Sequence, residues 1–217
     1  MSRISLIATL LLSLIGATRA ELVELNKKTY KPGKAVLTMS MNWGRTWTCG
    51  QYENAQIHSL IFRRTPLNDE SVYLELKTPS KLRVENKFIP YAFVIEPGEY
   101  VLAGFDVKVA RSVKDVGHLR GTEADLLKDG ASIGGKFVAN ADEVVYIGHF
   151  GLDCGAKPFL WRYYLENQEE FQGWVELFKG MGPALKYPFV KALPARFSLF
   201  DTTMLGYPFS IPNPVIE

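Results

Sequence analysis

The stretch IEPGEYVLAGFDVKV, residues 95–109, contains a tight turn and the longest strand pattern in the chain. Pro97 and Gly98 form the turn signal, because Pro presets one backbone angle and Gly tolerates the left-handed conformation that many turns require. Residues 100–109 follow, and they are rich in Val and aromatic side chains, which suit the pleated surface of a sheet. The stretch therefore predicts a turn that leads into a long β-strand.

Similar strand patterns lie on both sides of this stretch. Segment 72–77 shows the pattern most clearly, because its apolar and polar residues alternate as they do in a strand with one buried face. The other candidates are residues 35–41, 57–63, 91–95, 134–138 and 144–150. Short strands separated by turns such as Pro32-Gly33 predict a mainly β fold, an antiparallel β-sandwich of about seven or more strands.

Residues 110–133 interrupt the succession of strands. They are more polar than their neighbours and contain glycines at positions 117, 121 and 130. We therefore expect a long connection there, with one helical turn at residues 123–128. Long connections of this kind are often functional.

The last third of the chain has a different character. Residues 166–179 place apolar side chains at helical spacing and predict one amphipathic helix, which Gly180 ends. After Pro183 the repeated prolines predict an extended tail. We therefore expect residues 21–155 to form the β-sandwich domain and residues 156–217 to pack on that domain as a helix and an extended segment.

Residues 1–20 have the three-part layout of a cleavable signal peptide. Arg3 supplies the positive start, residues 4–15 are mostly apolar, and the small residues Thr18 and Ala20 precede a cut before Glu21. The alternative is a membrane anchor, but the apolar run is about a dozen residues long and a spanning helix needs about 20. No later stretch is long and apolar enough to span a membrane. We predict export to the periplasm, with secretion beyond the cell as the alternative.

The charge balance argues against nucleic-acid binding. The chain has 25 basic and 23 acidic residues, and two of the basic ones, Arg3 and Arg19, lie in the predicted signal. The mature chain is therefore formally neutral. Nucleic-acid binders usually carry a basic stripe that displaces phosphate counterions, and here the basic doublets do not extend into a patch.

Two cysteines, Cys49 and Cys154, are the whole complement. In an oxidising compartment two cysteines usually form a disulfide. Such a bond would close a loop of about 100 residues and would contribute about 4–5 kcal/mol by constraining the unfolded chain. The alternative is a pair of buried free thiols.

Two stretches resemble a known family. The turn and strand at residues 95–107 resemble the transthyretin-like, carboxypeptidase-regulatory-like β-sandwiches, and GGKFVANADEVVYIGHF, residues 134–150, resembles a phrase of bacterial exported domains of unknown function with that fold. The resemblance covers roughly residues 30–155 and implies a sandwich without catalytic residues. In this chain residues 140–143 read Asn-Ala-Asp-Glu, so the turn glycine that the family leads us to expect is absent.

The sequence contains no established catalytic motif. Zinc sites need three or four converging ligands, and none of the three histidines has a partner histidine at a ligand spacing. There is no Gly-x-Ser-x-Gly nucleophile elbow and no phosphate-binding loop. We therefore expect no cofactor and no metal, and more readily a non-enzymatic protein than an enzyme.

Aromatic residues gather near both cysteines. Trp43, Trp47 and Tyr52 surround Cys49, with Arg45 between the tryptophans, and Trp161 and Tyr163 follow Cys154. One interpretation is core packing around the bridge. The other is an aromatic surface that binds a partner, because Trp, Tyr and Arg are the usual anchors of interfaces.

Three functional hypotheses follow. The first is an exported, non-enzymatic envelope protein that binds or supports a protein or glycan partner. The second is an exported hydrolase with a dispersed active site around His118 or His149. The third is a secreted or immunity-type protein that acts on the product of another cell, which the sequence does not distinguish from the first.

Overall fold

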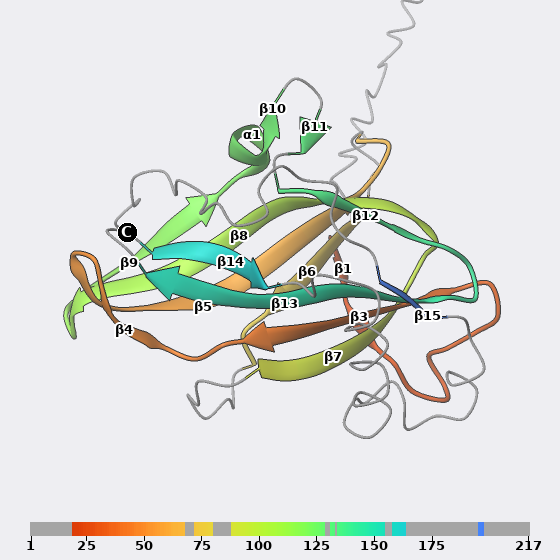
Figure 1. Cartoon of the computed structure of the whole chain (residues 1–217), viewed down its shortest axis with the longest axis horizontal. Helices are drawn as coiled ribbons and strands as arrows, with labels where there is room; N and C mark the ends of the chain where they lie inside the picture. Colours follow the sequence, from red (N-terminus) through yellow and green to blue (C-terminus); the bar gives the residue numbers. More distant parts are fainter. Residues whose placement is uncertain are drawn as a thin grey trace, which may run out of the picture.

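The computed structural model describes residues 19–67, 72–79, 88–128, 131–132, 134–154, 158–163 and 195–197. Within these ranges the protein is mainly β, and its strands form two large sheets and one small pair, shown in Figure 1. We call the seven-stranded sheet, which contains β5 and β8, sheet A, and the six-stranded sheet, which contains β3 and β13, sheet B.

Sheet A is built around two long strands, β5 (Tyr52–Arg64) and β8 (Gly98–Ser112), which pair antiparallel over most of their length. Its path runs through β1 (Arg19–Glu21), β6 (Tyr73–Lys77), β5, β8 and β12 (Lys136–Ala139). In addition, β4 (Thr46–Cys49) pairs with β5, and β9 (Asp115–Gly121) pairs with β8.

Sheet B has β13 (Val144–Cys154) and β3 (Ala35–Asn42) at its centre. Its path runs through β14 (Pro158–Tyr163), β13, β3, β7 (Phe88–Ile95) and β2 (Val23–Glu24), and β15 (Ala195–Phe197) also pairs with β13. A short helix, α1 (Glu123–Leu126), precedes the small pair of β10 (Leu127–Lys128) and β11 (Ala131–Ser132).

The two sheets contribute to one hydrophobic core. Phe62 of β5 meets Phe137 of β12 and Phe150 of β13 edge to face, with ring centroids 5.8 and 6.1 Å apart. Since Phe62 belongs to sheet A and Phe150 to sheet B, this contact joins the sheets directly. Core residues such as Leu37 and Leu60 are completely buried.

The strands that the alternation predicts are present in the structure. Segments 35–41, 57–63, 72–77, 91–95, 100–109, 134–138 and 144–150 correspond to β3, β5, β6, β7, β8, β12 and β13. Several strands run beyond the predicted ends, because a strand continues as long as its neighbour offers hydrogen-bonding partners. The mainly β fold class is thus confirmed.

The expectation of purely antiparallel sheets is wrong. β1 pairs parallel with β6, and β13 pairs parallel with both β3 and β15. These partners lie far apart in the sequence, so no tight hairpin dictates their relative direction. Alternation within a strand identifies its buried face but carries no information on the direction of a distant neighbour.

The expectation of a long connection over residues 110–133 is also wrong in part. The chain turns back after β8 and forms β9, which pairs antiparallel with it. Gly121, one of the glycines that indicated a loop, lies against Phe105, and a Cβ there would come within 2.3 Å of that ring. Glycine is required for packing at this position rather than for a turn. The predicted helical turn is present as α1.

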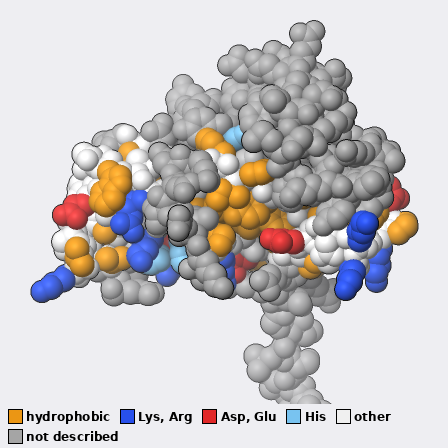
Figure 2. Space-filling model, turned by 90° about the horizontal axis from the view of Figure 1, so that it is seen from below, with side chains coloured by type: hydrophobic (Ala, Val, Ile, Leu, Met, Phe, Trp, Pro, Cys, Tyr) orange, Lys and Arg blue, Asp and Glu red, His pale blue; other side chains and the backbone are white. Residues whose placement is uncertain are grey.

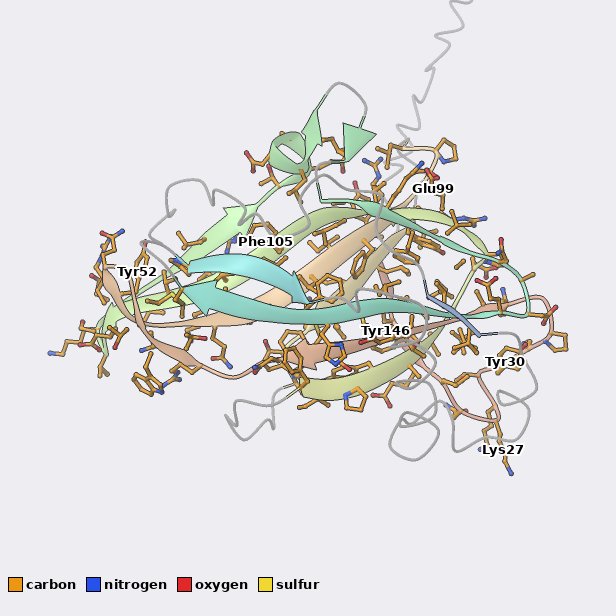
Figure 3. All side chains as sticks on the ribbon, viewed as in Figure 1. Lys27, Tyr30, Tyr52, Glu99, Phe105 and Tyr146 are labelled. Atoms are coloured by element: carbon orange, nitrogen blue, oxygen red, sulfur yellow. A yellow bond between two sulfur atoms is a disulfide. The ribbon has the colours of Figure 1, made fainter. Side chains whose placement is uncertain are left out.

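The missing turn glycine is replaced by an aspartate. Asp142 adopts φ of +55°, a left-handed conformation that Asp tolerates better than most residues. Its carboxylate accepts hydrogen bonds from the backbone N–H of Gly33 at 2.8 Å and from the hydroxyl of Tyr30 at 3.0 Å. Figure 3 places Tyr30 at the end of the molecule opposite Tyr52.

Several predicted segments lie outside the described residues, among them most of the signal peptide, the helix at residues 166–179 and most of the proline-rich tail. The last two residues of the predicted signal, Arg19 and Ala20, are in β1. A cut before Glu21 would therefore remove two residues of that three-residue strand from the edge of sheet A. None of the helices in the described ranges has the length and apolar character needed to span a membrane.

Candidate functional site

The predicted disulfide between Cys49 and Cys154 is present, with the two Cα atoms 5.0 Å apart. Cys49 ends β4 of sheet A, and Cys154 ends β13 of sheet B. The bond therefore ties the two sheets together at one end of the molecule, where β4 and β5 form a hairpin (Figure 1).

Trp43, the first tryptophan of the predicted cluster, belongs to the core. It is 0% exposed, and its indole Nε1–H donates a hydrogen bond to the hydroxyl of Tyr91 at 2.8 Å. The two rings meet edge to face, with centroids 6.4 Å apart. The backbone carbonyl of Trp43 accepts a hydrogen bond from the side chain of Gln56 at 2.7 Å. The indole N–H and the backbone carbonyl of Trp43 are thus both hydrogen-bonded, and Trp43 stabilises the hairpin as a core residue.

Trp47 is the opposite case. Its side chain is 64% exposed, more than any other tryptophan whose burial is described. The guanidinium carbon of Arg45 lies 5.3 Å from the centroid of its indole ring, which is a cation–π arrangement. The Nε of Arg45 is buried and has no hydrogen-bond partner among the described residues. Arg45 and Trp47 together form a surface element, which we call the Trp47 surface.

Tyr52 lies across the hairpin from Cys49 and is buried. Its hydroxyl accepts a hydrogen bond from Gln51 at 3.2 Å, and the guanidinium of Arg111 lies 5.4 Å from its ring centroid. Figure 3 shows Tyr52 at the end of the molecule that the hairpin forms. Tyr52 is therefore a core residue of the hairpin, and its hydroxyl is hydrogen-bonded to Gln51.

The second predicted aromatic group follows Cys154. The backbones of Trp161 and Tyr163 are in β14, opposite Gly151 and His149 of β13. Their side chains lie outside the part of the chain whose burial is described, so the predicted meeting of the two aromatic groups stays a prediction. The described residues thus divide the predicted set into a buried support, Trp43 and Tyr52, and a surface pair, Arg45 and Trp47.

Other exposed hydrophobic side chains accompany Trp47 on the surface. They are Val23, Leu67, Phe88, Val113 and Val138. Figure 2 shows one face of the molecule, on which hydrophobic side chains lie beside Lys and Arg side chains toward one end. Val113, at the tip of the β8–β9 hairpin, is 95% exposed.

A cavity of about 290 Å³ lies apart from this surface, at the edge where β2, β6 and β7 approach one another. Apolar residues such as Leu74 and Val94 line it, and Lys34 and Glu96, which form an ion pair, also belong to its lining. Tyr100 completes it and donates a hydrogen bond to the carbonyl of Glu96 at 2.8 Å. Burial raises the pKa of Tyr100 to about 12, so the phenol stays neutral at physiological pH. None of the predicted site residues whose side chains the structure describes lines the cavity.

His149, one of the two histidines proposed for a hydrolase, is only 7% exposed. Its Nδ1 is hydrogen-bonded with the hydroxyl of Tyr146, and its ring meets that of Phe88 edge to face. Burial lowers the pKa of His149 to about 4. The imidazole is therefore neutral at pH 7, and its environment is that of a core histidine.

We expect His149 to make stability depend on pH between about 4 and 6.5. The unfolded chain has an ordinary histidine pKa of about 6.5 and binds more protons than the folded chain in that window. The contribution of neutral His149 is complete above pH about 6.5 and is lost as the pH falls toward about 4, a total of about 3 kcal/mol. Urea unfolding at a series of pH values measures this dependence. Between about pH 4 and 6.5 the free energy of unfolding should change less with pH in His149→Gln than in the wild type. The same pH dependence of the unfolding free energy in both proteins would contradict the attribution of this effect to His149.

His118, the other proposed histidine, forms a pair with Asp106. Its Nδ1 lies 2.8 and 3.0 Å from the two carboxylate oxygens. The ring of His58 meets that of His118 with centroids 5.5 Å apart. No partner histidine lies at a ligand spacing in the sequence, but strand pairing brings His58 and His118 together although they lie far apart in the chain. The sequence carries no signal for this meeting, because β9, which carries His118, was expected to be part of a connection, and β8 lies between β5 and β9.

The described residues contain no group of three or more His, Cys, Asp or Glu side chains that could hold a metal ion by themselves. Searches of known protein families, of curated proteins and of solved structures find no match to this chain. The resemblance to transthyretin-like sandwiches therefore receives no support from these comparisons.

Proposed function

We propose that this protein is an exported, non-enzymatic binding protein of the cell envelope, a β-sandwich that recognises a protein or glycan partner through the Trp47 surface. The observation that carries the proposal is an exposed tryptophan with an arginine stacked against it. Trp and Arg are the residues that most often dominate binding energy, and exposing an indole to water is unfavourable unless a partner covers it.

The support beneath this surface favours binding. The disulfide, the buried Trp43 and the pairing of β4 with β5 all hold the hairpin in place. An element that is already ordered loses little conformational entropy when a partner docks. Thr48, between Trp47 and Cys49, has φ of +57°, a conformation that is unfavourable for a β-branched residue. Such local strain is common at binding sites.

The proposed compartment agrees with the chemistry of the cysteines. Disulfides persist in the periplasm and outside cells, whereas cytosolic thiols are kept reduced. The signal-peptide pattern at residues 1–20 supports the same compartment. We propose the periplasm as the site of action, with secretion as the alternative.

Binding by the Trp47 surface can be tested with two single-residue variants. We expect Trp47→Ala to capture less of the partner from envelope extracts. Its affinity for the purified partner should fall by about 2 kcal/mol or more, roughly 30-fold. Val113→Ala removes another exposed hydrophobic side chain and should bind like the wild type. A parallel glycan array distinguishes a glycan from a protein. Equal binding by Trp47→Ala and wild type would contradict the proposal.

A second candidate, the exported hydrolase, is favoured by one observation, the contact of His118 with Asp106. A carboxylate that holds Nδ1 orients the imidazole so that Nε2 can act as a base. Against it, neither residue lines the cavity described above. The purified protein should be assayed on ester, peptide and glycoside substrates beside His118→Ala. Turnover that His118→Ala abolishes would favour the hydrolase over the binding protein, and absence of turnover would remove it.

A further inference from the structure

Three side chains meet on the face of sheet A that points away from the core. They are His58 of β5, Asp106 of β8 and His118 of β9. Successive side chains of a strand point to opposite faces, and the neighbours Val107 and Leu119 are core residues. His58 is exposed, whereas His118 and Asp106 are partly exposed. The group is therefore accessible from solvent and does not belong to the Trp47 surface.

Asp106 fixes how His118 presents its ring. Both carboxylate oxygens lie within hydrogen-bond distance of Nδ1, at 2.8 and 3.0 Å. The proton of a neutral imidazole then resides on Nδ1, and the lone pair is left on Nε2. A carboxylate behind a histidine in this way is the usual arrangement around metal-binding histidines, because it sets the tautomer and increases the basicity of the ligand.

The spacing of the two histidines suits a shared ion. Their ring centroids are 5.5 Å apart and their planes are inclined by 80°. Two imidazoles that bind one tetrahedral ion through nitrogens at about 2 Å have centroids about 5 Å apart. The observed centroid spacing is therefore close to that of a shared ion, and binding requires the exposed His58 ring to turn one nitrogen toward the ion that Nε2 of His118 holds.

The backbone holds His58 in position. The register between β5 and β8 shifts between Ile57 and Ser59, so His58 is the extra residue of a β-bulge. Its carbonyl accepts hydrogen bonds from the backbone N–H and the hydroxyl of Thr78, at 2.9 and 3.0 Å. Bulges re-aim a side chain relative to the regular sheet, and here the re-aimed ring meets His118 across β8.

The charges around the histidines set the strength of the site. Lys108 lies opposite His118 in the register, and the guanidinium of Arg120 lies 3.8 Å from Asp106. Both cations oppose a further positive charge, and the carboxylate of Asp106 offsets part of this repulsion. The balance favours an ion that binds imidazole strongly over one that depends on carboxylate charge, that is, a divalent transition metal rather than Mg²⁺ or Ca²⁺.

We propose that His58 and His118 form a two-histidine binding site for Zn²⁺ or a related divalent transition metal, with Asp106 as the residue that orients His118. The described residues supply no third ligand. The remaining positions belong to water or to a side chain of a partner. This site is independent of the Trp47 surface and of the function proposed for it.

The test is a Zn²⁺ titration of the untagged mature chain by calorimetry, with the imidazole signals followed by NMR. The chain has three histidines. We expect the signals of His58 and His118 to shift and that of the buried His149 to stay. His58→Ala and His118→Ala should each weaken binding at least about tenfold, because each removes a ligand. Asp106→Asn should weaken it by about tenfold through loss of orientation.

Lys108→Ala is the matched control, because it changes the same face without removing a ligand. It should bind Zn²⁺ as well as or better than the wild type, and Mg²⁺ should shift none of the signals. Absence of Zn²⁺ binding at millimolar concentration, or wild-type affinity in both histidine variants, would overturn the proposal. Wild-type affinity in Asp106→Asn would overturn the role of Asp106. Circular dichroism of each variant confirms that it is folded.

Discussion

Replacing Trp43 with Ala is expected to lower the free energy of unfolding by about 3–5 kcal/mol, the range measured when large aromatic side chains are deleted from cores. Trp43 is completely buried and lies between β3 of sheet B and β4 of sheet A. Its loss would leave a cavity at the point where the chain passes between the sheets, and it would remove the hydrogen bond to Tyr91. Urea unfolding followed by far-UV circular dichroism measures the effect.

The control for this experiment is the neighbouring tryptophan. Trp47→Ala should change the free energy of unfolding by no more than about 0.5 kcal/mol, because exposed side chains away from special features contribute little. Equal losses of unfolding free energy in the two variants would show that the division into a buried support and an exposed surface pair is wrong. The same comparison shows whether Trp47→Ala is folded in the binding experiment. A variant of Trp43 would not be suitable there, because it would lose binding merely by unfolding.

Removing the disulfide is expected to have a similarly large effect. The bond closes a loop of 105 residues, and the chain-entropy estimate for such a loop is about 4–5 kcal/mol. The loss arises in the unfolded chain, which gains conformational freedom when the link is cut. The double variant Cys49→Ala/Cys154→Ala should therefore unfold at a much lower urea concentration than the wild type.

The dependence on urea identifies the origin of this effect. An unfolded chain without the link exposes more surface, so the slope of the unfolding free energy against urea should increase in the double variant. Wild type unfolded in the presence of a reductant provides the matched comparison and should resemble the variant. A double variant with the stability of the oxidised wild type would show that the bond contributes nothing to the fold.

Local patterns were sufficient to predict seven of the fifteen described strands, among them the central strands of both sheets. Segment 72–77 corresponds to β6 because Leu74 and Leu76 are both buried on one face, as the alternation required. β9 was missed because Gly117 and Gly121 indicated a loop. Gly121 is in fact the residue against which Phe105 packs, and that contact connects two strands. A pattern within one segment cannot show which ring a glycine faces.

The sequence indicated which residues to consider as a candidate site but not which of them are buried. The chain shows Trp43, Arg45 and Trp47 as near neighbours, and nothing in their spacing tells which tryptophan is buried. The answer depends on Tyr91, which lies on another strand and receives the hydrogen bond of Trp43. The meeting of His58 with His118 is hidden for the same reason, since only the pairing of β5, β8 and β9 brings their rings together.

The sequence by itself determined the mainly β class, the positions of the central strands of both sheets and the pairing of the two cysteines. These properties depend on residue type and on order along the chain: alternation defines a strand, Pro-Gly defines a turn, and two cysteines allow one bond. The tertiary structure alone decided the parallel pairing of β13 with β3, the burial of Trp43 beside an exposed Trp47, and the meeting of His58 with His118. Each of these depends on contacts between residues distant in the chain, and the free energy of such contacts is absent from any local pattern.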